Sequence, residues 1–206
     1  MIGIVDYGSG NIEAIRNIYK NLNIETKIVK IADDLVKVSK IVLPGVGAFD
    51  FAMSQLNNSG LRLALDEAVL IKKTPVLGVC VGMQIMANSS EEGSIEGLGW
   101  ISGIVRRFDA EKIDVLPKLP HMGWNEISKS DHELLRSIDC SLGFYFLHSY
   151  YFDSKYKKNV IARAFYAHDF DCAVSIEHIH GVQFHPEKSH KNGIQVFKNF
   201  SDLIPC

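Results

Sequence analysis

The segment TPVLGVCVGMQIM, residues 74–86, places a glycine-flanked cysteine directly after an apolar run, and this combination decides the fold class. Residues 75–79 are almost continuously apolar, which is typical of a strand buried on both faces of a parallel sheet. Residues 81–89 are predicted to form a helix. Cys80 therefore falls on a strand-to-helix turn at the carboxyl end of a strand, where such sheets bind ligands.

The rest of the first half repeats this alternation of strand and helix. Further strands are predicted at residues 2–5, 26–31 and 40–44, and helices at residues 11–22, 32–38 and about 49–72. Short apolar strands separated by helices indicate an α/β, doubly wound, flavodoxin-like fold. Its open central sheet is expected to be mostly parallel, with helices on both faces.

The second half, from Gly97 to about Gln183, has more closely spaced and partly alternating strands. They are predicted at residues 100–108, 123–128, 143–152, 159–166, 172–178 and 179–184. We expect them to form an antiparallel or mixed extension of the sheet, closed by a last helix at about 192–203. No linker or repeat interrupts the chain, so residues 1–206 are expected to form one domain.

Composition excludes several classes of protein. The chain has 206 residues, of which 47% are hydrophobic and 22% are charged, and its net charge is −2, so a globular protein with a substantial core is predicted. Without a basic run, signal peptide or apolar stretch of membrane length, we expect no nucleic-acid partner and no membrane span. The cysteines match no disulfide or metal-binding spacing, which favours free thiols in a reducing cytoplasm. They are Cys80, Cys140, Cys172 and Cys206.

Cys80 is the candidate nucleophile. Gly78 and Gly82 flank it at two residues on either side, as in a nucleophile elbow, where a sharp strained turn lifts the reactive side chain above the sheet. A following helix would favour the thiolate through its dipole, and the N–H of Val81 could bind an oxyanion. The alternative is a small buried cysteine that packs as a hydrophobic residue.

A cysteine nucleophile needs a base, and the segment GVQFHPEKS, residues 181–189, supplies a candidate. Pro186 ends an apolar strand so that His185 and Glu187 emerge near its end. A histidine can take the thiol proton and later return one to a leaving amine, while a carboxylate orients the ring. The alternative is a surface strand end with an incidental histidine and glutamate.

Five motifs carry a resemblance to a known family. They are LPGVGAF (43–49), GVCVGMQ (78–84), PHMGWN (120–125), FLHSYY (146–151) and GVQFHPE (181–187). The chain resembles the class I, triad-type glutamine amidotransferases from residue 2 to about residue 200, and within them the branch of glutaminase subunits of imidazole glycerol phosphate synthase. It departs from the family pattern at positions 79 and 81, where valines replace the common isoleucine and leucine without a large change in size.

The resemblance implies hydrolysis of L-glutamine to glutamate and ammonia, without a cofactor. Cys80 matches the nucleophile, His185 the acid–base and Glu187 the orienting carboxylate. The oxyanion would be bound by the backbone N–H groups of Val81 and Val46. In this family the segment around Val46 rests in an unproductive orientation until the partner binds its own ligand, so weak activity is expected for the isolated chain.

Substrate contacts are implied in the same way. Gly47 belongs to the segment whose peptide reorients, although residue types alone leave an ordinary turn open. Gln84 lies one helical turn beyond the cysteine and matches a glutamine-contacting position; alternatively it caps a buried helix. Glu92 would meet the substrate's α-ammonium group, and the backbone of Ser149 and Tyr150 would bind its carboxylate and amino groups.

The implied partner is a (β/α)8-barrel cyclase or synthase subunit, bound as a heterodimer, whose axial passage takes up the ammonia. Asn11, Trp124, Tyr145 and Lys188 match interface positions of the branch. Trp124 could instead belong to the core, and Lys188 could be a solvated charge.

Other hypotheses remain at this point. DYGSGN, residues 6–11, could bind phosphate, but it lacks the third glycine of the dinucleotide motif, and we prefer a turn capped by Asn11 or Ser9. His178, His180 and His185 could form a metal site, although no further ligand completes a known spacing, and no metal is predicted. The glutaminase could also serve another synthase, such as one that amidates a surface sugar, or the chain could be a non-enzymatic scaffold.

Overall fold

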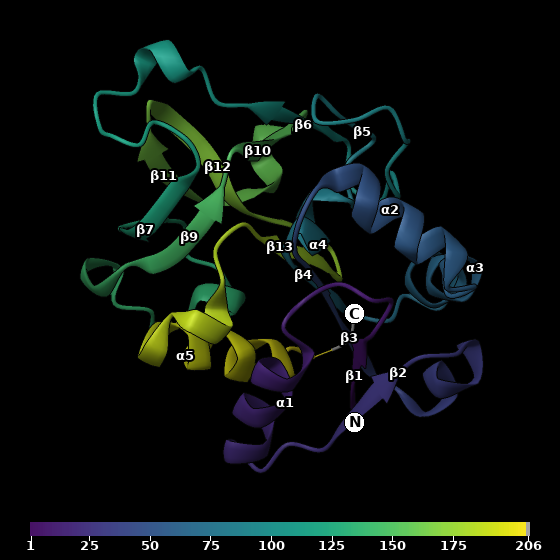
Figure 1. The fold of residues 1–206 in the computed structure, drawn as a ribbon. Helices are drawn as coiled ribbons and strands as arrows, with labels where there is room; N and C mark the ends of the chain where they lie inside the picture. The colour runs from purple at the N-terminus through teal and green to yellow at the C-terminus, as the bar shows by residue number, and fades with distance from the viewer. Residues whose placement is uncertain (205–206) are drawn as a thin grey trace.

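A mixed β-sheet forms the centre of the computed structural model, which describes residues 1–204 (Figure 1). In spatial order its strands are β2 (Thr26–Val29), β1 (Ile2–Val5), β3 (Lys40–Gly45), β4 (Val76–Cys80), β13 (Ile179–Val182), β12 (His168–Ile176), β10 (Tyr150–Ser154), β6 (Gly103–Arg107) and β5 (Ser89–Ser90). The first five are parallel to one another, and β12 and β10 run antiparallel to their neighbours. The predicted α/β fold is confirmed.

The second half adds two smaller strand pairings. β11 (Val160–Tyr166) pairs with β12 and with β8 (Ser128–Lys129), so it extends the main sheet. β7 (His121–Asn125) and β9 (Phe144–His148) form a separate antiparallel pair. This β7–β9 pair lies beside the main sheet and forms one wall of the site described below (Figure 1).

Helices cover both faces of the parallel part of the sheet (Figure 1). They are α1 (Ile12–Asn21), α2 (Phe49–Asn58), α3 (Arg62–Asp66), the π-helical turn η2 (Glu67–Ile71), α4 (Val81–Gln84) and α5 (His190–Asp202). Short 3-10 turns are η1 (Ala32–Lys37), η3 (Ala110–Lys112), η4 (Glu133–Leu135), η5 (Cys140–Leu142), η6 (Lys157–Asn159) and η7 (Pro186–Lys188). α1 and α5 share a face, where the buried rings of Tyr19 and Phe197 meet edge to face with centroids 5.3 Å apart.

Three predicted elements are wrong in detail. The strand predicted for residues 123–128 is divided between β7, which ends at Asn125, and β8 in the main sheet. The helix predicted for residues 81–89 ends at Gln84, because N–H groups of the loop around Leu98 take the carbonyls of the following residues; the N–H of Leu98, for example, donates to Ile85 O. The strand predicted for residues 143–152 is broken at Ser149, where the chain crosses from the β7–β9 pair to β10 in the main sheet.

Within residues 1–204, no helix combines the length and apolarity that crossing a bilayer requires. Cys80, Cys140 and Cys172 are free thiols. Cys206 lies outside the described residues.

Candidate active site

The turn that holds Cys80 is strained and tightly packed. Cys80 has φ 54° and ψ −114°, a left-handed backbone conformation that L-residues adopt at a cost, often at functional sites. A Cβ on Gly82 would lie 1.8 Å from the carbonyl oxygen of Leu43, and one on Gly78 would lie 2.7 Å from Gly82 O. Only glycine fits these two positions, so β4, α4 and β3 can approach closely enough to present the sulfur at the sheet edge.

His185 and Glu187 form a buried pair beside the cysteine. The Nδ1 of His185 lies 2.8 Å from Oε1 of Glu187, and the two side chains are only 3% and 2% exposed. Asn11 donates from Nδ2 to the same carboxylate oxygen over 2.9 Å. Cys80 and His185 also line one cavity, described below, and the cysteine lies close enough to act on the protonation of the ring. The three predicted catalytic side chains therefore meet, although more than a hundred residues separate Cys80 from the other two.

The electrostatics of this pair favour charged forms. Burial lowers the pKa of His185, but the hydrogen bonds and charges of Cys80 and Glu187 outweigh it and raise that pKa to about 10. Burial likewise raises the pKa of Glu187, but the bonds from His185 and Asn11 bring it below its usual value. The imidazolium is thus held next to the sulfur at neutral pH.

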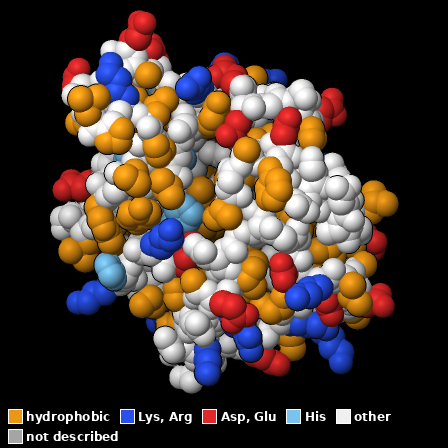
Figure 2. Space-filling model, in the orientation of Figure 1, with side chains coloured by type: hydrophobic (Ala, Val, Ile, Leu, Met, Phe, Trp, Pro, Cys, Tyr) orange, Lys and Arg blue, Asp and Glu red, His pale blue; other side chains and the backbone are white. Residues whose placement is uncertain are grey.

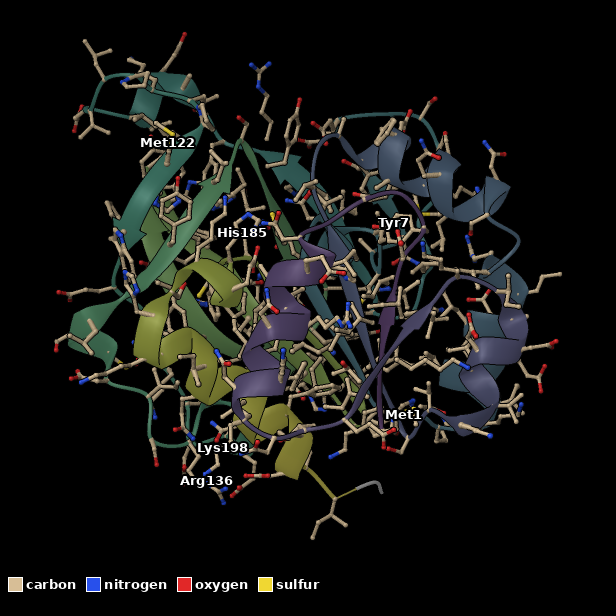
Figure 3. The ribbon with its side chains drawn as sticks, turned by 60° about the horizontal axis from the view of Figure 1, so that its bottom comes forward. Met1, Tyr7, Met122, Arg136, His185 and Lys198 are labelled. Carbon is tan, nitrogen blue, oxygen red and sulfur yellow. The ribbon has the colours of Figure 1, made fainter. Side chains whose placement is uncertain are left out.

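Cys80 and His185 open onto a cavity of about 350 Å³ between the sheet edge and the β7–β9 pair, whereas Glu187 is not among its lining residues. Most of the predicted site residues line it, namely Val46, Gly47, Cys80, Val81, Gln84, Glu92, Ser149, Tyr150, His185 and Lys188. In the view of Figure 3, His185 lies between the β7–β9 pair, which carries Met122, and the segment that carries Tyr7. A wider hollow of about 710 Å³ beside Trp124 contains none of the predicted catalytic side chains.

The two predicted oxyanion donors are in different states. Val81 is the first residue of α4, so its N–H has no acceptor within the helix. The N–H of Val46, by contrast, donates to the hydroxyl of Ser9 over 2.9 Å, and that hydroxyl donates back to the carbonyl oxygen of Val46 over 2.9 Å. In this conformation the Val46 N–H is engaged by Ser9.

Hydrogen bonds to other parts of the chain hold the side chains that are predicted to contact the substrate. Glu92 accepts the Phe49 N–H at the start of α2 through Oε2, at 2.8 Å, which leaves Oε1 for a ligand. Gln84 donates from Nε2 to Tyr150 O and to Oε1 of Gln183, each at 2.9 Å. These contacts hold the side chains that line the cavity before any substrate binds.

A buried histidine pair next to the cavity has no counterpart among the predicted site residues. His148 contacts the Tyr150 carbonyl through Nδ1 at 2.8 Å and His121 through Nε2 at 3.1 Å. Asn125 lies 3.2 Å from the other nitrogen of His121. Tyr150 O can only accept, so His148 carries a proton on Nδ1. Asn125 Nδ2, which also donates to Phe165 O, donates to Nε2 of His121, so His121 carries its proton on Nδ1 and donates it to Nε2 of His148; both rings are then neutral. Burial lowers the pKa of His121 to about 4 and that of His148 to about 3.

Three of the predicted interface residues, Trp124, Tyr145 and Lys188, lie together, and Lys188 also lines the cavity. Trp124 is 50% exposed, which contradicts its assignment to the core, and it stacks on His190 with ring centroids 5.2 Å apart. Lys188 lies over the ring of Tyr145 at 5.4 Å, next to the same tryptophan. Figure 2 shows hydrophobic side chains exposed around the β7–β9 pair, where Met122 is 59% exposed.

Asn11 donates to Glu187, as described above, and its place at the interface stays a prediction. Asn11 occupies the N-cap position of α1, as expected for one of the two candidates, but it makes no side-chain capping bond, because its side chain bonds Glu187. The imagined metal ligands do not converge: His178 bonds Val69 O and His180 bonds Ser175. In the described part of the chain, no three potential ligands surround one point.

Comparison with known proteins decides the family. The family Glutamine amidotransferase class-I matches residues 3–203. The chain belongs to the class I glutamine amidotransferases.

Relatives within this family are similar over their whole length. The imidazole glycerol phosphate synthase subunit HisH of Leptospira borgpetersenii is 51% identical over 98% of this chain and 100% of its own. The protein of the same name from Bdellovibrio bacteriovorus is 48% identical with the same coverage. These relatives place this amidotransferase among proteins that carry the HisH name.

Solved structures agree with this fold. PurLQS from Thermotoga maritima has a TM-score of 0.72 at 16% identity and covers 98% of this chain and 97% of its own. A glutamine amidotransferase from the same organism has a TM-score of 0.64 at 18% identity, with 99% and 86% coverage. At such identities the likeness concerns the amidotransferase fold alone.

Proposed function

We propose that this amidotransferase hydrolyses glutamine at Cys80 and supplies the ammonia to a (β/α)8-barrel cyclase, as the glutaminase subunit of imidazole glycerol phosphate synthase. One observation carries the catalytic part: a strained cysteine lines one cavity with a histidine that is paired to a buried glutamate. The relatives at 48–51% identity support the pathway. Supply to another synthase is not favoured, because no observation on the chain requires it.

The geometry supports a two-step hydrolysis. The sulfur of Cys80 attacks the amide carbon of glutamine, and the electron pair of the C=O bond moves to oxygen, where the Val81 N–H binds it. His185 protonates the nitrogen, ammonia leaves, and a γ-glutamyl thioester remains. His185 then takes a proton from water, which attacks the thioester, and glutamate leaves as the C–S bond breaks. Glu187 keeps the ring oriented and stabilises its charged form.

The cavity has groups suited to both ends of glutamine, the α-amino acid group and the side-chain amide. Gln84 and the backbone of Ser149 and Tyr150 line it, and Glu92 retains a carboxylate oxygen for an α-ammonium group. Recognition of the amide is needed to exclude glutamate, whose charge would lie next to the sulfur.

The proposed partner surface is the cluster of Trp124, Tyr145, Lys188 and His190 at the mouth of the cavity, in which Tyr145 is half-buried and Lys188 also lines the cavity. Exposed aromatic residues of this type often anchor protein interfaces. A barrel that docks here could reach the segment around Val46, whose N–H is held by Ser9 in the unbound chain. Weak activity without the partner follows from this arrangement.

Glutamate release from the purified chain tests the catalytic proposal. Wild-type protein should release glutamate from glutamine, Cys80→Ala should release none, and the matched control Cys140→Ala should behave as wild type, because Cys140 does not line the cavity. Unchanged release by Cys80→Ala would exclude Cys80 as the nucleophile. Capture of a (β/α)8-barrel protein from native extract, lost on Trp124→Ala, tests the partner.

A further inference from the structure

Gln183 is a fully buried polar residue next to the nucleophile. It follows β13 directly, and its side chain is 0% exposed. β13 pairs in parallel with β4 so that Val182 faces Val79, and the next residues along the two strands are Gln183 and Cys80. Its Nε2 lies 3.8 Å from the sulfur of Cys80, within the range of a hydrogen bond to sulfur. The strand register itself thus brings the amide to the sulfur.

The orientation of this amide is determined by its neighbours. Tyr150 O can only accept, so the group of Gln84 that faces it at 2.9 Å is the nitrogen Nε2. The same nitrogen lies 2.9 Å from the Gln183 side chain, which must therefore present its oxygen to Gln84. The NH₂ group of Gln183 is left facing the sulfur, where an amide oxygen would repel a thiolate.

A neutral hydrogen-bond donor is suited to stabilise negative charge on the Cys80 sulfur throughout the reaction. The titratable groups near Cys80 are His185, Glu92 and Lys188, which line the same cavity, and Tyr7, whose hydroxyl donates to Pro44 O. His185 must release its proton to the leaving nitrogen, so the stabilisation that its charge gives to the sulfur is lost during each turnover. An amide N–H, in contrast, stabilises negative charge without giving up a proton.

We propose that Gln183 is a further catalytic residue, which donates a hydrogen bond to the Cys80 sulfur and stabilises it as a thiolate. The inference rests on the proposed role of Cys80 as nucleophile. The bond would act at two moments: in the resting enzyme, and when the thioester is hydrolysed, since the electron pair of the breaking C–S bond then returns to sulfur. A purely structural role, tying β13 to α4, would not affect the charge on sulfur.

The test compares the pH dependence of Cys80 alkylation in wild type and in Gln183→Met, which has similar length and no donor. Iodoacetamide labelling is followed by peptide mass spectrometry, so Cys140 serves as an internal control. Loss of a hydrogen bond to a charged group should raise the pH midpoint at Cys80 by about one unit, and lower kcat about tenfold below that midpoint with recovery at higher pH. Gln195→Met, the same change on α5, should leave both unchanged.

An unshifted midpoint in folded Gln183→Met would overturn the proposal, even if the rate fell equally at every pH. If that variant does not fold, the side-chain amide resonances of Gln183 in the ¹⁵N-labelled wild type provide the test. They should shift on alkylation of Cys80 and follow the same pH midpoint, whereas invariant resonances would contradict the hydrogen bond. The proposed role of Cys80 as nucleophile is tested separately: glutamate release by Cys80→Ala would contradict it, whatever the result for Gln183.

Discussion

The contact between Ser9 and Val46 predicts that Ser9→Ala raises the glutaminase rate of the isolated chain. The Ser9 hydroxyl accepts the Val46 N–H and donates to the carbonyl of the same residue, each at 2.9 Å. Both bonds hold the Val46 peptide in a conformation whose N–H is engaged by Ser9 and not available to an oxyanion. The isolated chain would then hydrolyse glutamine rapidly only in the fraction of molecules that has released this peptide.

The size of the effect follows from the two bonds. Each contributes about 0.5–1.5 kcal/mol net, so removing both shifts the balance by about 1–3 kcal/mol, or about 5- to 150-fold in population. An oxyanion donor contributes about 10²–10³-fold to kcat, which sets the upper limit. We therefore expect Ser9→Ala to raise the unstimulated kcat by about one order of magnitude and to leave the partner-stimulated kcat unchanged.

The assay is steady-state glutamate release with and without the barrel partner. Ser59→Ala is the matched control, since Ser59 makes a hydroxyl–carbonyl contact of 2.7 Å at the end of α2, away from the cavity. Equal unstimulated rates in wild type and folded Ser9→Ala would refute the reasoning, because the serine would then not restrain the donor.

Three further outcomes are expected. Asn11→Ala should lower kcat for glutamine about tenfold, because Glu187 loses a hydrogen bond; a change in partner affinity alone, measured by titration calorimetry, would instead place Asn11 only at the interface. Since burial lowers the pKa of His121 and His148, the unfolded chain binds protons below about pH 6.5 while the folded chain does not. Urea unfolding should therefore show a loss of about 1–2 kcal/mol per histidine between pH 7 and pH 5, and equal values would contradict neutral rings. Gly82→Ala should prevent correct folding of the elbow, seen as loss of Cys80-dependent turnover and of several kcal/mol in unfolding free energy, because its Cβ would overlap a carbonyl of β3.

The sequence predicts those elements that are determined by residues close to one another in the chain. The parallel half of the sheet follows from apolar runs between helices, and the elbow follows from Gly78 and Gly82. The meeting of Cys80 with His185 was predictable only in part: Cys80 ends the parallel strand β4 and His185 closely follows β13, but that β13 lies next to β4 depends on long-range packing.

Features that depend on contacts distant in sequence were not predictable in this way. The early end of α4 results from hydrogen bonds made by a loop more than ten residues away, and the break at Ser149 results from the crossing between two sheets. Ser9 gives no local sign of its contact with Val46. Gln183 had a usable signal, since it stands two residues before His185 and an extended chain turns both side chains to one face.

The most direct test of the central claim is the identification of the covalent intermediate. The chain, with its barrel partner, is mixed with glutamine, quenched in acid within the first turnover and digested, and the peptides are analysed by mass spectrometry. We predict the mass of one added glutamyl group on the peptide that contains Cys80. The corresponding peptide of Cys80→Ser should carry no glutamyl thioester. A glutamyl group on another residue, or turnover without any adduct under conditions that trap thioesters, would contradict the account.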